Sequence, residues 1–260
     1  MSGTMEATWP RADGRASRHE GKRGDGQDGN GNEAATPRIR IATDGPYLVS
    51  GGATLDEAQI VSVEGHHEYR RVRTFDVRET YALCRCGNTT TPPFCDGSHK
   101  THRFDGAEAA SRAPYRDRAD VYPGAGAYLF DDNRCAYARF CHREDGEAWT
   151  LTEESSDPRL KREAVRASMD CPAGRLTHVD TQDARVYEPA LAPGITLLQD
   201  VDEKVSGPLF VHGRIALEAA DGTEYERRNR YALCRCGVSR NKPFCDAMHV
   251  NVGFAASLGV

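Results

Sequence analysis

YALCRCGNTTTPPFCDGSHK, residues 81–100, and YALCRCGVSRNKPFCDAMHV, residues 231–250, are two copies of one stretch. Each copy holds three cysteines and one histidine, and no residue is gained or lost between them. The ligand-type residues are Cys84, Cys86, Cys95, His99, Cys234, Cys236, Cys245 and His249. Thiolates and an imidazole at fixed spacing are typical metal ligands. Their repetition at one internal spacing therefore predicts a duplicated metal-binding unit.

The composition indicates the cellular compartment and excludes some classes of partner. The 260 residues include 34 basic and 39 acidic side chains, for a net charge of −5, which argues against nucleic acid as a partner. No long apolar run and no secretory leader are found, so we expect a cytoplasmic protein without a membrane partner. In that reducing compartment the nine cysteines are better explained as metal ligands than as disulfides.

Changes in composition divide the chain into four parts. Residues 1–36 are rich in glycine and charge and predict a disordered tail. A first unit (37–104) and a second unit (190–255) each contain one copy of the metal loop. Between them, residues 120–180 have a different character and hold three more cysteines. We therefore expect two small metal units that flank a separate middle segment.

Short β-branched runs predict a β-rich α+β fold. IRIATDGPYLVSGG, residues 39–52, predicts two strands around a turn. Further strands are expected near 58–63, 69–75 and 79–84. GPYLV at 45–49 aligns with GPLFV at 207–211, and the tight turn expected at Asp221-Gly222 shortens the second unit. Each unit is thus expected to be a small antiparallel sheet that leads into its metal loop.

The end of each metal loop predicts a helical turn. Cys95 and His99 are four residues apart and would share one face of a helix. Pro93 fits the first position of that helix, whose N-terminal dipole would stabilise thiolates. Asp96, and Asp246 in the second unit, are expected to cap the helix start or to accept an N–H.

The first loop resembles the signature of the CDGSH (mitoNEET-like) iron–sulfur domain family. Thr89 and Pro93 occupy the signature's Ser/Thr and Pro positions, and residues 95–99 read CDGSH. Ser239 and Pro243 match in the second loop, where Ala247 and Met248 replace the glycine and serine. The resemblance implies one [2Fe–2S] cluster per unit, held by three Cys and one His. A Cys₃His set can also hold zinc, which would leave the protein colourless.

The single histidine in each set has chemical consequences if the resemblance holds. A neutral imidazole in place of a thiolate makes the cluster less negative and raises its reduction potential. The free ring nitrogen can take up a proton and couple reduction to pH. Protonation of the coordinating nitrogen would release the metal, so we expect acid-labile clusters.

The middle segment carries a third candidate site at Cys135, Cys141 and Cys171. Cys135 and Cys141 have the outer spacing of C-x₂-C-x₂-C, Ala138 stands at the central position, and a Cys-Pro dipeptide follows later. The segment resembles the divergent single-cluster ferredoxin family, which implies a [3Fe–4S] cluster or a [4Fe–4S] cluster with one iron lacking cysteine. Three unrelated buried cysteines are the alternative.

Two polar residues and a predicted helix lie near the middle cysteines in the sequence. His142 and Asp170 are neighbours that could reach an open iron, although neither stands at the central position. Asp157-Pro158 predicts the start of a helix that ends before Asp170. Leu160, Ala164, Val165 and Met169 form its apolar stripe.

Together these features predict an electron-transfer protein with three clusters. The two CDGSH sheets are expected to pack as a pseudo-two-fold pair within a monomer, by analogy with the homodimer of single-unit relatives. Its partners would be redox proteins, either a reductase or an oxidoreductase. No catalytic residues are predicted. Two alternatives stay open, a redox enzyme that acts on a small molecule and a cluster-transfer or redox-sensing protein. Arg85 and Arg235 would either screen cluster charge or be solvated loop residues.

Overall fold

A computed structural model describes residues 36–256, so the predicted tail lies outside the described residues except for its last position. Its first sheet has the strand order β14-β1-β2-β5. The bounds are Ala216–Glu218 (β14), Arg38–Ile41 (β1), Tyr47–Ser50 (β2) and Tyr81–Leu83 (β5). β1 and β2 confirm the two strands expected around the turn. β14 belongs to the second unit, yet it pairs in parallel with β1 of the first.

The second sheet has the order β15-β13-β12-β3-β4. The bounds are Arg230–Leu233 (β15), Val205–His212 (β13), Gly194–Asp200 (β12), Thr54–Val63 (β3) and His66–Thr74 (β4). In this sheet a strand of the first unit joins the second unit, because β3 pairs in parallel with β12. The strand before each metal loop, β5 or β15, pairs antiparallel with β2 or β13.

The two units therefore share their sheets, and the expectation of a separate antiparallel sheet in each unit is wrong. Ile39, Leu55, Ile195 and Leu217, which come from both units, are at most 3% exposed and lie in one apolar core. Alternating burial along β1 and β2 is the period-2 pattern that predicts strands. That pattern shows which face is buried but not which strand lies alongside, so it did not show the exchange.

The middle segment folds around a third sheet of order β11-β10-β7-β6. Its strands are Val186–Tyr187 (β11), Leu176–Asp180 (β10), Ala127–Asp131 (β7) and Asp120–Tyr122 (β6), and a small hairpin is formed by His142–Arg143 (β8) and Gly146–Glu147 (β9). The helices are Tyr115–Arg118 (α2), Ala148–Glu153 (α3) and Pro158–Met169 (α4). The predicted helix is confirmed, with Asp157 accepting the Arg159 N–H at 2.7 Å. Ala164 and Val165 of its stripe are buried, whereas Leu160 and Met169 are partly exposed.

Short helices follow the last cysteine of each loop, at Ser98–Thr101 (α1) and Met248–Asn251 (α5). The predicted helix start at Pro93 is wrong, because Cys95 lies before α1. Gly97 has a φ of 92° and Ala247 a φ of 69°. A residue in the left-handed region interrupts an α-helix, so the helical turn cannot extend back to the cysteine.

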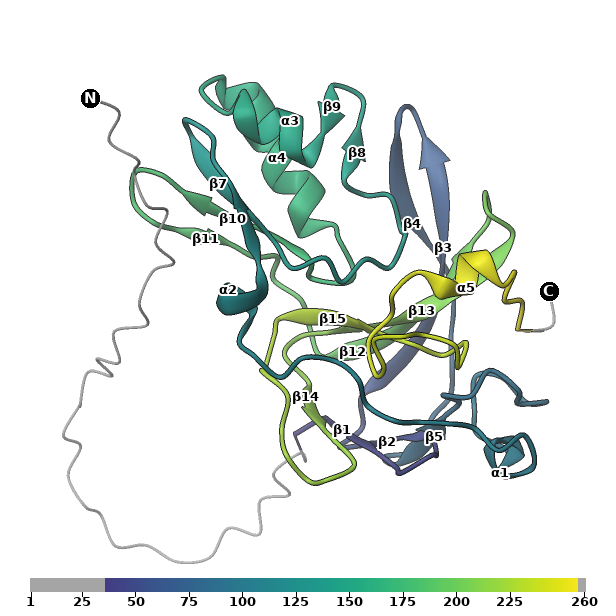
Figure 1. Cartoon of the computed structure of the whole chain (residues 1–260). Helices are drawn as coiled ribbons and strands as arrows, with labels where there is room; N and C mark the ends of the chain where they lie inside the picture. Colours follow the sequence, from purple (N-terminus) through teal and green to yellow (C-terminus); the bar gives the residue numbers. More distant parts are fainter. Residues whose placement is uncertain (1–35, 257–260) are drawn as a thin grey trace, which may run out of the picture.

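The arrangement of the sheets places the three candidate sites in a row (Figure 1). The middle segment with α3 and α4 occupies one end, the first sheet and α1 occupy the other, and β12, β13 and β15 lie between them. Strands of the second unit thus lie between the middle segment and the first sheet.

No helix among residues 36–256 has the length and apolar character needed to span a bilayer.

Candidate metal centres

Backbone hydrogen bonds fold the first metal loop back on the end of β5. The Cys84 N–H donates to the Pro93 carbonyl at 2.8 Å, and the Cys95 N–H donates to the Ala82 carbonyl at 3.0 Å. The Sγ atoms of Cys84 and Cys86 are then 3.7 Å apart, and Cys95 Sγ lies 3.4 Å from His99 Nδ1. The four predicted ligands of the first unit are therefore brought together as two pairs.

The second loop repeats this geometry closely. The Cys234 N–H donates to the Pro243 carbonyl at 2.8 Å, and the Cys245 N–H donates to the backbone of β15 at 2.9 Å. The Sγ atoms of Cys234 and Cys236 are 3.5 Å apart, as are Cys245 Sγ and His249 Nδ1. Substitution of the glycine and serine by Ala247 and Met248 has left the ligand arrangement intact.

Hydroxyl and carboxylate side chains support each loop at matching positions. Thr89 and Ser239 each donate to a backbone carbonyl of the loop at 2.7 Å. Asp96 accepts the N–H groups of Thr90 and Ser98, and these bonds lower its pKa well below the usual range. Asp246 accepts an equivalent pair in the second unit. The expectation that both aspartates receive N–H groups is confirmed.

The pairing of the ligands agrees with a centre of two metal ions. Two ligands on one tetrahedral metal with bonds of about 2.3 Å lie about 3.8 Å apart, close to the Cys84–Cys86 separation. Among residues 36–256, no three His, Cys, Asp or Glu side chains are grouped to hold one ion. The hydrogen bond from Cys86 lowers the pKa of Cys84 to about 6, so a thiolate forms readily in this pair. A cavity of about 240 Å³ beside Cys84 provides space for a cluster.

The two sites differ in their exposure to solvent. Cys95 and His99 of the first unit are partly exposed, whereas Cys245 and His249 are 3% and 2% exposed. The second site is enclosed because α5 packs on β13 and the Phe254 carbonyl accepts the Ser206 N–H at 2.7 Å. Burial lowers the pKa of His249 to about 4, which keeps its imidazole neutral and able to bind metal.

Glycines allow the two metal loops to touch. Gly87 has a φ of 77° and Gly237 a φ of 83°. A Cβ on Gly87 would lie 2.5 Å from the Cys236 carbonyl oxygen, and one on Gly237 would meet the Cys86 carbonyl oxygen even more closely. The backbones of the two Cys-x-Cys turns thus pack against each other in a reciprocal way, and only glycine fits at either position.

Arg85 and Arg235 are not solvated loop residues, since they are 1% and 4% exposed. Arg235 Nε donates to the Gly207 carbonyl at 2.6 Å, and Nη2 donates to the Leu198 carbonyl at 3.0 Å. Arg85 donates to the Gly106 and Ala42 carbonyls. Each arginine therefore ties a metal loop to neighbouring backbone while remaining buried.

Tyr47 is a loop-supporting residue that was not predicted from the sequence. Its hydroxyl donates to the carbonyls of Cys234 and Pro243 at 2.8 and 3.0 Å, across the boundary between the units. Leu209 takes the aligned position in the second unit and has no hydroxyl. The mismatch between GPYLV and GPLFV was the signal that could have identified it.

The three middle cysteines lie next to three different elements of the middle segment. Cys135 follows β7, Cys141 precedes β8 and Cys171 follows α4. Burial raises the pKa of Cys141 to about 12, with smaller contributions from the charges of Cys171 and Cys135. Their assignment to one site stays a prediction from the sequence.

The backbone around Cys135 has an unusual conformation. Asn133, Tyr137 and Arg139 have φ angles of 62°, 56° and 60°, which non-glycine residues seldom adopt. The Tyr137 N–H donates to Cys135 Sγ at 3.3 Å. Alternation of left- and right-handed residues turns successive N–H groups to one side and forms concave anion sites, including many iron–sulfur sites. One N–H of this loop is thus turned toward a candidate ligand.

The other candidate ligands of the middle site are occupied elsewhere. His142 Nδ1 lies 3.2 Å from the Glu147 carboxylate, and Asp170 pairs with Arg143 at 3.3 Å. Ala138 is 5% exposed and packs within an apolar cluster that includes Phe140, Leu198 and Phe210. Neither His142 nor Asp170 is thus brought to the thiols as a fourth ligand.

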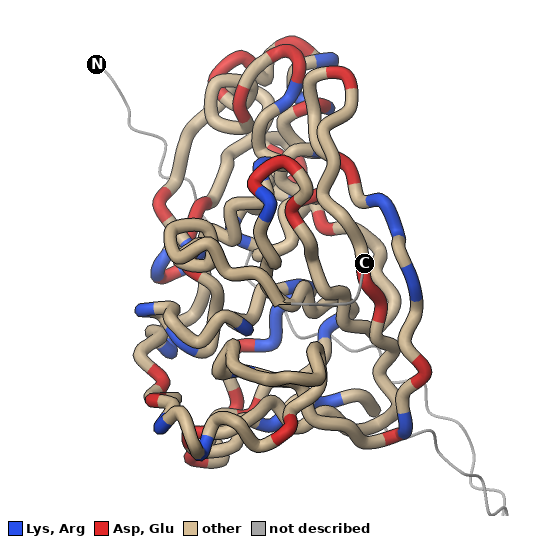
Figure 2. Tube along the Cα trace, turned by 90° about the vertical axis from the view of Figure 1, so that its right-hand side faces the viewer, with Lys and Arg blue, Asp and Glu red and all other residues tan. Residues whose placement is uncertain are grey.

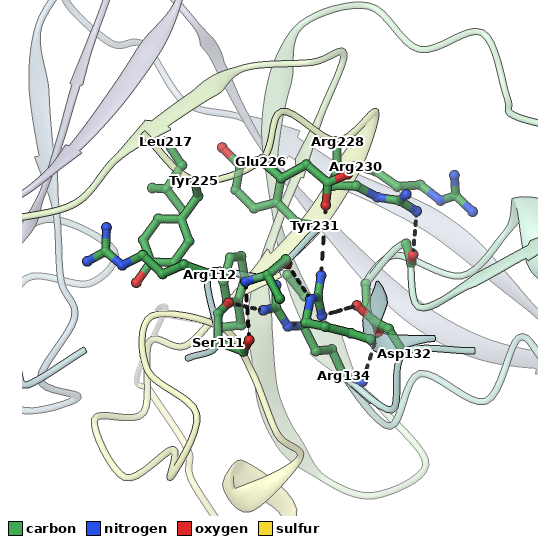
Figure 3. Close-up of a pocket in the computed structure, with 16 residues that line it drawn as sticks. Ser111, Arg112, Asp132, Arg134, Leu217, Tyr225, Glu226, Arg228, Arg230 and Tyr231 are labelled. Atoms are coloured by element: carbon green, nitrogen blue, oxygen red, sulfur yellow. Dashed lines mark hydrogen bonds and ion pairs between the residues drawn. The ribbon is translucent and has the colours of Figure 1, made fainter. Parts of the chain in front are cut away.

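A further cavity lies behind the second metal loop (Figure 3). It is lined by arginines that include Arg118 and Arg134, with Asp132 and Phe244 beside them. Arg118 pairs with Asp132 at 2.7 Å, and Arg134 stacks 4.0 Å from the Phe244 ring centroid. The cavity volume is about 20 Å³, enough for a water molecule. The cavity therefore lies against the second metal loop at Phe244.

The left-handed backbone at Ala247 gives a test of the second loop. Glycine adopts a φ near 69° without the steric cost that alanine bears. Ala247→Gly is therefore expected to stabilise the protein by about 0.5–1 kcal/mol, measured as a higher urea midpoint. Gly97→Ala, at the matching place with no atom within 4 Å of the new Cβ, should lose a similar amount. Equal midpoints for all three proteins would contradict this account.

Comparison with known proteins agrees with the two loops. The family model described as iron-binding zinc finger, CDGSH type, matches residues 44–100 and again residues 206–250. No curated protein and no solved structure matches the chain. The two matches contain the eight loop ligands described above. The chain therefore carries two units of the CDGSH type in tandem.

Proposed function

We propose that this protein passes single electrons between redox partner proteins, using a [2Fe–2S] cluster in each CDGSH unit and a third cluster at the middle cysteines. The observation that carries the proposal is the packing of the middle thiols against the second metal loop. One packed group contains Ala136, Cys171, Ala173, Ala232 and Cys245. Burial raises the pKa of Cys245, and the charge of the neighbouring Cys135 adds to this effect. Sites this close together favour transfer within the molecule.

Two [2Fe–2S] clusters are favoured over zinc by the paired ligands. Each unit offers one Cys–Cys pair and one Cys–His pair, as two irons require. The bound clusters supply one-electron oxidation and reduction. The histidines face the cysteine partner with Nδ1, which leaves Nε2 of the partly exposed His99 available to a proton or to a partner protein.

A pseudo-two-fold relation between the units is supported by three reciprocal features. β3 and β14 are exchanged between the sheets, Gly87 and Gly237 contact each other's loops, and the Thr89 and Ser239 hydroxyls make equal bonds. One chain would then take the place of a homodimer, which agrees with the proposed monomer.

A three-iron cluster is favoured for the middle site over a four-iron cluster. Ala138, at the place of the missing central cysteine, is buried among apolar side chains. His142 and Asp170 are engaged with Glu147 and Arg143. With three thiols and no further ligand brought to them among the described residues, a [3Fe–4S] cluster is the best fit to this donor set.

Exposure suggests where partner proteins would exchange electrons. The first site lies at one end of the row, with Cys95 and His99 partly exposed on the α1 side. The second site is enclosed between the other two and would relay electrons between them. In Figure 2, acidic and basic residues are both spread over the trace, with neighbouring basic stretches along its right-hand edge, and such a mixed surface suits the proposed protein partners.

Cluster transfer is the second candidate, favoured by the same exposure of His99. All nine cysteines are free thiols, and we propose the reducing cytoplasm as the compartment in which the protein works.

Iron and acid-labile sulfide per chain, combined with electron paramagnetic resonance in both redox states, test the proposal. We expect about seven iron and eight sulfide, with a three-iron signal in the oxidised protein and [2Fe–2S] signals after reduction. Reversible reduction and re-oxidation by a small electron-transfer protein should leave the iron content unchanged. Loss of iron to an apo-acceptor would support cluster transfer, and an anaerobically purified protein that holds only zinc would refute both.

A further inference from the structure

A cation of the second unit lies beside a ligand of the first. Arg235 and Cys84 line the same cavity of about 240 Å³, together with Thr89 and Pro93 of the first loop. The guanidinium is held from the second unit, because its hydrogen bonds go to carbonyls of β12 and β13. Both acceptors are neutral, so these bonds do not compensate the positive charge.

Arg235 remains charged in this position. An arginine guanidinium does not lose its proton in proteins. The guanidinium is also 5.6 Å from the Phe254 ring centroid, which closes the cavity on the side of the C-terminus. A buried cation in a medium of low dielectric interacts strongly with a nearby negative charge.

The contact from the first unit to the second metal loop is of a different kind. Arg85, the counterpart in the first unit, lies 5.7 Å from the Tyr47 ring centroid and 5.4 Å from that of Phe104. The group that reaches the second loop from the first unit is the Tyr47 hydroxyl, which donates to the Cys234 carbonyl. Across the boundary the first loop thus meets the Arg235 guanidinium, while the second loop accepts a hydrogen bond from the Tyr47 hydroxyl, whose ring lies beside Arg85.

We propose that Arg235 sets the reduction potential of the first unit's cluster from across the boundary, so that the two identical ligand sets have different potentials and the first is the higher. Reduction adds one negative charge, which a fixed cation nearby stabilises. Greater exposure of Cys95 and His99 to water acts in the same direction. The inference rests on the two clusters of the proposed function but does not require transfer between proteins.

Redox titration with dithionite, followed by electron paramagnetic resonance, tests the inference in the full-length protein. Signals are assigned with His99→Cys and His249→Cys, each of which lowers the potential of its own cluster. In the unchanged protein the first cluster should be reduced at the higher potential. Arg235→Gln should lower its reduced-to-oxidised ratio at least tenfold at a fixed ambient potential, about 59 mV for one electron.

Matched variants separate charge from packing. Arg235→Lys keeps the charge and should stay closer to the unchanged protein than Arg235→Gln does. Arg85→Gln removes the counterpart and should shift the first cluster less than Arg235→Gln.

Three outcomes would overturn the inference. They are equal potentials for the two clusters, a higher potential for the second cluster, and an Arg235→Gln effect confined to the second cluster. The comparison of the two potentials needs no arginine variant, so it decides even if Arg235→Gln loses its clusters. Reversible reduction without transfer to any protein would refute the proposed function alone, while the absence of [2Fe–2S] signals would refute both.

Discussion

Gly237→Ala is expected to cost about 3–5 kcal/mol of unfolding free energy and to deplete both CDGSH units of iron. The new Cβ would collide with the Cys86 carbonyl oxygen, a backbone atom that cannot rotate away. The left-handed φ of 83° adds about 1–2 kcal/mol for a residue with a side chain, and overpacking adds the remainder. Because the two Cys-x-Cys turns lie back to back, the displacement reaches ligands of both units. Urea unfolding and iron per chain measure the two effects.

Gly222→Ala is the matched control for this substitution. Gly222 has a φ of 85°, but no atom lies within 4 Å of the position that its new Cβ would take, so only the conformational cost remains. It should lose about 1 kcal/mol and keep its iron. If Gly237→Ala behaved like Gly222→Ala, the loops would not be in contact in solution.

Arg230→Met is expected to destabilise the protein by about 3 kcal/mol and to release the middle cluster first. Arg230 is 2% exposed and donates to the carbonyls of Cys171 and Ser168 at 2.8 and 2.6 Å. It also pairs with Glu188, which is partly buried. Removal of Arg230 takes a buried cation from Glu188, which keeps Asn229 and Arg228. It also takes one of two donors from the Cys171 and Ser168 carbonyls. Since Arg230 lies on β15 and binds the backbone of a middle thiol, the loss should loosen that site before the CDGSH loops.

The control for Arg230 is its neighbour Arg227. Arg227 is exposed and pairs with Glu224 on the surface, so Arg227→Met should change stability by less than about 0.5 kcal/mol. The three-iron and [2Fe–2S] resonance signals report the two kinds of site separately. Equal loss from all sites, or equal stability of the two variants, would show that Arg230 does not anchor the middle segment.

The pairing of the candidate ligands in each loop could be expected from the sequence because their spacing is local. Cys84, Cys86, Cys95 and His99 lie within one loop, and their spacing alone fixes which side chains can meet a common group. The Cys₃ set of the middle segment was proposed from motif spacing and stays a prediction. Helix α4 was predicted for a similar reason, since Asp157 and Pro158 cap it through neighbouring residues.

Features that depend on distant residues could not be predicted in this way. The exchange of β3 and β14 is decided by which edge is free in the folded core, and burial patterns carry no such information. The burial of Arg235 depends on carbonyls of Leu198 and Gly207, which lie on other strands far back along the chain. The helix start was misplaced because Gly97 permits both a helix cap and the left-handed turn that it adopts.

The exchange of β3 and β14 also limits how such a protein can be divided. A fragment that ended after the first metal loop would leave β1 without its parallel neighbour β14. It would also leave β3 without β12, so that one backbone edge of β3 is unpaired. Halves produced separately should therefore aggregate or else recombine with one another when mixed. Neither repeat is therefore expected to fold by itself, because neither retains a complete set of its own strands.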